Sequence, residues 1–188
     1  MSPIIDLIGS AKAYGWGSFQ SSLSFESIAT ITPTGQSSFG FSSIPGSYKH
    51  LQIRAFCLPS TTYPSLSFTF NGSSTGYNLH MVRGNGSAVS ASGSTGRTSS
   101  SIFWGQGMLT TGNVAIVDII DYANTTKNKT IKSISGQDNN TGTNVCSVEL
   151  MSHLWTNTNA ITSIDFLVSG GGPTLLTGSS IALYGIRG

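Results

Sequence analysis

The chain has 188 residues, only 9% of which are charged, and nine Lys and Arg against seven acidic residues leave a formal net charge of +2. This balance predicts no binding of nucleic acid, because nucleic-acid binders gather Lys and Arg on one face. No apolar run approaches the roughly 18 residues that cross a membrane, and the first residues do not resemble a secretory signal. We expect a folded protein with one main domain.

Residues 1–20 form a distinct segment, an N-terminal arm ahead of the domain at 21–188. Aliphatic side chains come first, and aromatic side chains separated by glycines follow. This composition is too apolar for a solvated tail and too rich in glycine for a long helix. An arm that packs onto a neighbouring subunit or a partner explains it best, and the alternative is that it covers an edge of its own sheet. The candidate assembly contacts are Ile4, Ile5, Leu7, Ile8, Tyr14, Trp16 and Phe19.

Strand patterns begin at residue 22. Four runs, 22–31, 36–44, 48–58 and 65–71, alternate apolar and polar residues and end at turn signals such as Pro45-Gly46. In the third run Leu51, Ile53, Ala55 and Cys57 are predicted to face inward, against His50, Gln52 and Arg54 outward. In the fourth, Leu66, Phe68 and Phe70 share the inward face.

Residues 84–101 differ from everything before them. They are rich in Gly, Ser and Thr and have almost no apolar content, which predicts a long exposed loop. Structure resumes at residues 102–104 and breaks again at Gly105-Gln106-Gly107.

The segment 113–136 is predicted to be a central hairpin. Its first run, 114–122, is apolar on both faces except at Asp118 and Asp121, which predicts a strand buried on both sides. Asn and Thr at 124–126 favour a turn. The second run, 129–135, is more polar and is interpreted as an outer strand guarded by charge.

Three more strands are expected, at 145–155, 160–169 and 179–186. Ile164, Phe166 and Val168 share a face in the second of them, and Ile181 and Leu183 do so in the third. The total is about nine strands without a convincing helix. We therefore predict an all-β fold, an antiparallel β-sandwich in the form of a jelly roll.

The residues that carry catalytic chemistry are scattered. The carboxylates are Asp6, Glu26, Asp118, Asp121, Asp138, Glu149 and Asp165, and no two of them form a recognisable acid/base motif. His50, His80 and His153 lack the spacing of metal ligands, and no serine lies in a nucleophile-elbow pattern. We expect a protein that is not an enzyme and has no metal or cofactor.

Other residues have both a structural and a functional interpretation. Cys57 and Cys146 are expected to be buried thiols. The hairpin has three lysines, Lys127, Lys129 and Lys132, which are expected to be solvated in the turn and along an exposed strand edge. The alternative is that they contact an acidic partner. The aromatic residues Tyr63, Tyr77, Trp104, Tyr122 and Trp155 are expected to fill the core or an interface. The alternative is a sugar-stacking platform in which Trp104 and Trp155 face the ligand.

Several stretches, in their order, resemble a recurrent type of tailed-bacteriophage virion protein. They are IPGSYKHLQIRAF from Ile44, SFTFNG from Ser67, VDIIDYANTTKNKTIKSISG from Val117, LWTNTNAITSIDF from Leu154 and the closing IALYGIRG from Ile181. The resemblance covers about three quarters of the chain and leaves out the first 20 residues.

Proteins of this type are jelly-roll or β-sandwich parts of the particle, such as head decoration (cement) proteins, fibres and tail components. The resemblance implies self-association, often as homotrimers, contact with other virion proteins such as the major capsid protein, and no catalytic residues. It implies synthesis in the cytoplasm of the host bacterium and a final place in the virion. Of these roles we favour capsid decoration, because the chain has no fibre-like repeats. The protein is then expected to dock on the particle and stabilise it through its N-terminal arm and its subunit contacts. The alternatives are a tail or fibre component and a carbohydrate-binding module for host-surface glycans.

Overall fold

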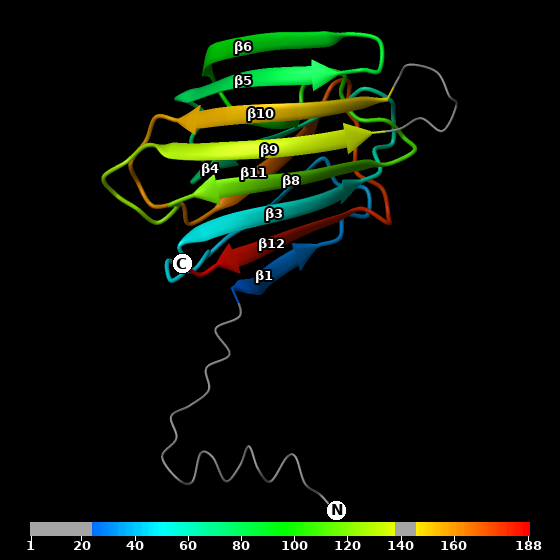
Figure 1. Cartoon of the computed structure of the whole chain (residues 1–188). Coiled ribbons are helices and arrows are strands. Elements are labelled where there is room, and N and C mark those ends of the chain that lie inside the picture. Colours follow the sequence, from blue (N-terminus) through cyan, green and yellow to red (C-terminus); the bar gives the residue numbers. More distant parts are fainter. Residues whose placement is uncertain (1–23, 138–145) are drawn as a thin grey trace, which may run out of the picture.

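A computed structural model describes residues 24–137 and 146–188, which form twelve β-strands and no helix. The strands form two antiparallel sheets, one of eight strands and one of four, packed face to face (Figure 1). Because these residues form only strands, none of them makes an apolar helix of membrane-spanning length. The predicted all-β antiparallel sandwich is confirmed.

The strands follow one another along the chain as β1 (Phe25–Ile31), β2 (Ser38–Phe41), β3 (His50–Cys57), β4 (Ser65–Phe70), β5 (Tyr77–Gly84), β6 (Val89–Arg97), β7 (Ser100–Phe103), β8 (Asn113–Ile120), β9 (Lys129–Gln137), β10 (Ser147–Trp155), β11 (Ile164–Ser169) and β12 (Ser180–Ile186).

Eight of these strands have jelly-roll topology. The order β1-β12-β3-β8 makes half of the large sheet, and β2-β11-β4-β7 makes the small sheet. Consecutive strands of this set alternate between the sheets, except that β4 and β7 pair with each other in the small sheet. This is the strand order of a jelly roll with two Greek keys. The predicted jelly roll is confirmed by this strand order.

The other four strands widen the large sheet. The strands β5 and β6 lie between β4 and β7 in the chain, and β9 and β10 lie between β8 and β11. In space they continue the sheet as β8-β9-β10-β5-β6, so that β6 is its far edge (Figure 1). The large sheet is thus twice as wide in strands as the small sheet that covers it.

The core fills the space between the sheets. The inward residues predicted on β3, β4, β11 and β12 are all buried, which confirms the alternation on those strands. Beyond the small sheet, a second cluster forms on β5 and β10 around Leu79, Met81 and Met151, with Trp104 packed against it. A loop after β7 therefore replaces the small sheet as the cover of this part.

The prediction of a long loop at 84–101 is wrong. Half of this stretch is β6, an exposed edge strand that pairs with β5 from Val89 to Arg97, and its two ends belong to β5 and β7. Gly and Ser have low strand propensity, but the hydrogen bonds offered by the neighbouring strand override it. The strand β5 has no counterpart among the predicted strands either. Together with β6 and with β7, which lies where structure was expected to resume, it raises the count from about nine to twelve.

The central hairpin is confirmed, with two corrections. The strands β8 and β9 pair antiparallel in the middle of the large sheet. Only one face of β8 is buried in the described part of the molecule, because Val114, Ile116 and Ile120 are exposed on the other. The strand β9 is also not an outer strand, since β10 pairs along its whole length. Its polar residues alternate between a buried and an exposed face instead of guarding an edge.

Candidate functional site

The described residues provide no metal site, since no three of their His, Cys, Asp and Glu side chains converge. The nearest arrangement to a catalytic one surrounds His153, whose Nδ1 contacts the hydroxyl of Ser100 and whose Nε2 lies 3.0 Å from that of Ser133. Both ring nitrogens thus meet serine hydroxyls rather than an orienting carboxylate. Burial, and secondarily the charge of Arg97, lower the pKa of His153 to about 4, so the ring is neutral at pH 7. We interpret this trio as a buried polar network.

The outer face of the large sheet carries the most unusual surface. Six aliphatic side chains from four adjacent strands are each between 40% and 55% exposed there. This outer patch consists of Val82, Val114, Ile116, Ile134, Val148 and Leu150. Contiguous exposed apolar groups are uncommon on a soluble monomer and mark a contact surface more often than single exposed residues do.

Strand register makes the outer patch continuous. Val82 pairs with Leu150, Leu150 with Ile134, and Ile134 with Ile116, which forms one apolar row across β5, β10, β9 and β8. The parallel row contains Val148 and Val114 with Gly136 between them. A Cβ on Gly136 would lie 3.8 Å from Val114, so the glycine leaves a shallow dip without being required for space. The two rows make an apolar surface that a partner can cover.

A polar row borders the outer patch. The Asp118 carboxylate accepts a 2.8 Å hydrogen bond from Gln52 Nε2 and lies 3.4 Å from Lys132 Nζ. Arg54 Nε donates to Gln52 Oε1 at 2.8 Å, and its guanidinium stacks over the rings of Phe25 and Tyr184. Asp118 and Lys132 form an ion pair, and Arg54 contacts an amide oxygen and two aromatic rings, so the face combines an apolar half with a polar half of low net charge.

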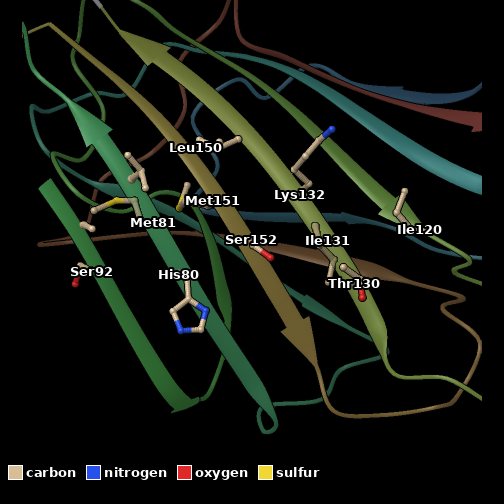
Figure 2. A pocket seen from close by; sticks show the side chains of 12 residues that line it. His80, Met81, Ser92, Ile120, Thr130, Ile131, Lys132, Leu150, Met151 and Ser152 are labelled. Atoms are coloured by element: carbon tan, nitrogen blue, oxygen red, sulfur yellow. The ribbon is translucent and has the colours of Figure 1, made fainter. Parts of the chain in front are cut away.

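A groove of about 860 Å³ runs along the same face, over β8, β9, β10, β5 and β6. Figure 2 shows its outward side chains, among them Leu150 at one side and His80, Ser152 and Lys132 from three neighbouring strands. The side chain of Lys132 is 64% exposed at its border. The groove has an apolar floor with a few polar groups, which is the usual composition of a site for an apolar or aromatic group.

Trp155 does not face a ligand, so that interpretation was wrong. It is 1% exposed and packs with Tyr77, its ring centroid 6.1 Å from that of the tyrosine, and with Phe70. Burial raises the pKa of Tyr77 to about 12, and its hydroxyl donates to Ser73 O and accepts from Phe70 N–H. Tyr77 and Tyr122 are also fully buried, so these aromatic residues fill the core as expected.

Trp104 is half-buried on the opposite, inner face. It packs against the second cluster, and the Arg97 guanidinium lies over its ring at 5.1 Å. The backbone N–H groups of Trp104 and Gln106 each donate a hydrogen bond of 3.1 Å to the carboxylate of Glu149. The Gly105-Gln106-Gly107 segment therefore binds an internal carboxylate. A Cβ on Gly105 would meet Glu149 Oε1 at 2.6 Å, which explains the glycine there.

The three lysines of the hairpin have different roles. Lys127 and Lys132 are exposed and pair with Asp121 and Asp118, which agrees with a solvated surface. Lys129 is fully buried, contrary to the prediction. Its ammonium donates to three backbone carbonyls, those of Asn124, Lys127 and Thr158. The polar turn needs a donor for these inward carbonyls, and the sequence pattern did not show that.

The predicted assembly contacts Ile4, Ile5, Leu7, Ile8, Tyr14, Trp16 and Phe19 lie outside the described residues. Of the cysteines, Cys57 is a free buried thiol whose pKa burial raises to about 12, and Cys146 is half-buried. Sequence reasoning missed the residues that β5 contributes to the outer face, His80 and Val82. The signal was present in the alternation of residues 77–82, YNLHMV.

No protein-family model matches the chain, and no curated protein matches it. Among solved structures, the chain is similar to galectin LEC-6 of Caenorhabditis elegans, with a TM-score of 0.36 and 11% identity over 82% of this chain and 94% of that one. It is also similar to a structure of infectious bursal disease virus, Gt strain, with a TM-score of 0.11 and 9% identity over 85% of this chain and 41% of that one. Both likenesses are too weak to carry an argument about family or function.

Proposed function

We propose that this protein is a non-enzymatic structural component of a tailed-phage particle, with capsid decoration as its role, and that it works by packing against other protein surfaces. The observation that carries the proposal is the outer patch, six half-exposed aliphatic side chains on four adjacent strands. The phage assignment rests on the sequence resemblance described above. The assembly role rests on the surface chemistry.

The size of the patch indicates how it is used. Fully burying one such side chain contributes about 1 kcal/mol beyond its half-buried state, so the six together contribute several kcal/mol. Two rows on four strands cover roughly 300 Å², since neighbouring strands lie about 4.8 Å apart. A stable interface buries about 800 Å² on each partner. The outer patch is therefore the centre of an assembly contact, and adjoining surface completes it.

Charge favours the same use. The polar row beside the patch is internally paired, and the whole chain has a net charge of only +2. Copies of a nearly neutral surface repel one another little, so apolar contact can dominate.

The oligomeric state tests the assembly role. We expect sedimentation of the full chain at micromolar concentration to show a homo-oligomer, with a trimer as the first expectation, and Ile116→Asp to dissociate it. Leu167→Asp is the matched control, because Leu167 is similarly exposed but lies on β11 of the small sheet. Equal dissociation by both variants, or a monomeric parent chain, would contradict a contact through the outer patch.

Immunogold labelling of purified particles of the phage that encodes the protein tests the virion role. Labelled heads support capsid decoration. Labelled tails or fibres would reassign the role within the particle, and particles without label would overturn the proposal.

The second candidate is a carbohydrate-binding module for host-surface glycans. Trp155, Tyr77 and Tyr122 are buried and Trp104 is half-covered by Arg97, so the aromatic platform on which that function depended is reduced to Trp104 and the exposed Tyr63. A glycan array compares the parent chain with Trp104→Ala. Binding that the substitution removes would favour this candidate over the structural one.

A further inference from the structure

We propose that the aromatic part of the N-terminal arm, Tyr14 to Phe19, folds back over its own domain and occupies the groove on the outer face of the large sheet. This inference deepens the proposed function. It rests on the proposed function in one respect only, namely that the face with the covered groove is the face used for assembly. The observations that carry it are the composition of the arm, its point of attachment, its reach and the composition of the groove.

The arm joins the domain at the correct end of the sheet. The first residue of β1, Phe25, pairs with Ile186, Ile186 pairs with His50, and the neighbouring Leu51 pairs with Ile119. Ile120 and Thr130 line the groove and pair with each other, so they are at the same end of the sheet as Phe25. Figure 1 shows the start of β1 on the same side as the end of β8 and the start of β9. The Phe25 ring lies on the outer face under the Arg54 guanidinium. The chain thus enters β1 beside the face that contains the groove.

The length of the arm matches the position of the groove. Counting strands at about 4.8 Å each, β8 lies roughly 14 Å and β5 roughly 29 Å from β1. An extended chain spans about 3.3 Å per residue, so Phe19 reaches about 20 Å and Tyr14 about 36 Å from Phe25. The aromatic residues therefore reach the groove, whereas the residues from Ile4 to Ile8 extend beyond it at about 55–70 Å.

The chemistry of the two parts is complementary. The groove has aliphatic side chains such as Val82 and Leu150 beside the exposed ammonium of Lys132. Aromatic rings bury much apolar area and are attracted to cations above their faces. Gly15 and Gly17 flank Trp16, and residues without a side chain allow the backbone to approach a flat sheet closely. A second copy of the domain does not provide such a narrow aromatic strip.

Filling the groove also solves the problem of interface size. The outer patch alone covers less than half of what a stable contact needs on each partner. An arm in the groove covers Val82 and Leu150, which belong to both the groove and the outer patch, and adds its own outward surface beside the four remaining patch residues. The proposal therefore explains how a face with a small apolar patch becomes an assembly contact.

Trypsin gives a direct test in the full chain, because Lys12 is the only Lys or Arg before Lys49. A protease needs several extended residues on both sides of the bond, so a docked Tyr14–Phe19 segment hinders cleavage after Lys12. Cleavage of a transiently released segment follows its released population. We expect cleavage after Lys12 in the parent chain to be at least about tenfold slower than in Leu150→Asp or in Trp16→Ser.

Leu167→Asp is the control, since it places the same charge at a site of similar exposure on the other sheet. Trp16→Ser is outside the described domain and keeps the test valid if Leu150→Asp disturbs the fold. Equal and rapid cleavage in the parent chain, in Leu150→Asp and in Trp16→Ser overturns the proposal. Protection that disappears on tenfold dilution also overturns it, because the occupant would then be the arm of a second copy. Sedimentation of the same samples reports assembly separately, so a monomer with a protected Lys12 contradicts the proposed function and not the docked arm.

Discussion

The two faces of the eight-stranded sheet are built from the same strands but differ in burial. The inner face is packed in the core, and the outer face is largely exposed. On β9, Ile131 is fully buried, while Ile134, three residues further on, is exposed on the other face. On β8, Val117 lies in the core, and its neighbour Ile116 lies in the outer patch. Each pair has nearly the same chemistry. An apolar residue in a strand is therefore evidence of a buried face only where a second layer of the structure covers that face.

Among substitutions on the inner face, replacement of the buried Lys129 is expected to lower the free energy of unfolding most. Lys129→Met keeps the apolar stem but removes the donor to three partly buried backbone carbonyls. Each unsatisfied carbonyl costs about 1–3 kcal/mol, so we expect the free energy of unfolding to fall by about 4 kcal/mol. Lys132→Met on the outer face of the same strand should change it by less than about 1 kcal/mol. Urea unfolding of both variants measures the difference, and similar losses would contradict the internal role of Lys129.

The isoleucine pair on β9 tests apolar packing alone. Ile131→Ala should lower the free energy of unfolding by about 3 kcal/mol, because it leaves a cavity between the sheets. Ile134→Ala removes a half-exposed side chain and should cost less than about 1 kcal/mol in the dissociated chain. Guanidinium unfolding at a concentration where the chain is monomeric separates the two. A large loss for Ile134→Ala would mean that the outer face is already covered within one chain, and repeating the measurement with Trp16→Ser would show whether the arm covers it.

The buried histidine makes the inner face sensitive to acid. The pKa of His153 is lowered to about 4 in the folded chain, against an ordinary value of about 6.5. The unfolded chain therefore binds more protons between these values, and stability falls as the pH drops from about 6.5 towards 4. At pH 4.5 the loss from this residue is about 2–3 kcal/mol. His153→Gln keeps polar contact with the serines and should reduce the difference in stability between pH 7 and pH 4.5 by that amount.

The smallest expected effect concerns the polar row of the outer face. Asp118→Asn weakens the contact with Lys132 and keeps an oxygen for Gln52. Exposed ion pairs contribute about 0–1 kcal/mol, so thermal unfolding should change little. A loss of more than about 2 kcal/mol in the free energy of unfolding would show that the arm or a neighbouring molecule buries this row. The row would then behave like the inner face of the sheet.

Much of the jelly roll could be predicted from local patterns. The alternation in 48–58 and in 65–71 identified β3 and β4 with their inward residues, because the side-chain period of a strand is visible in any half-buried sequence. The hairpin at 113–136 was found in the same way. The strand β6 was not, because its Ser and Gly residues have no pattern and pair only since β5 lies beside them.

The candidate site was less accessible to sequence reasoning. Trp155 was considered as a ligand-facing residue and is core, because a single aromatic residue has no periodicity that separates a surface platform from packing. The outer patch joins residues of β5, β8, β9 and β10 that are far apart in the chain. Its parts were visible as an apolar excess on both faces of residues 114–122. Their convergence into one surface required the register.

The sequence by itself determined the class of the fold, the inward residues of four of the eight jelly-roll strands and the near-neutral surface, because these depend on composition and on a period of two residues. The tertiary structure alone decided which strands are central, that Lys129 is an internal donor, and that the second apolar face of β8 is an open patch beside a groove. These properties depend on which strands lie side by side and on how far the small sheet extends. A strand whose second face is exposed until a partner covers it has the same local sequence as a strand that is buried on both faces within one chain.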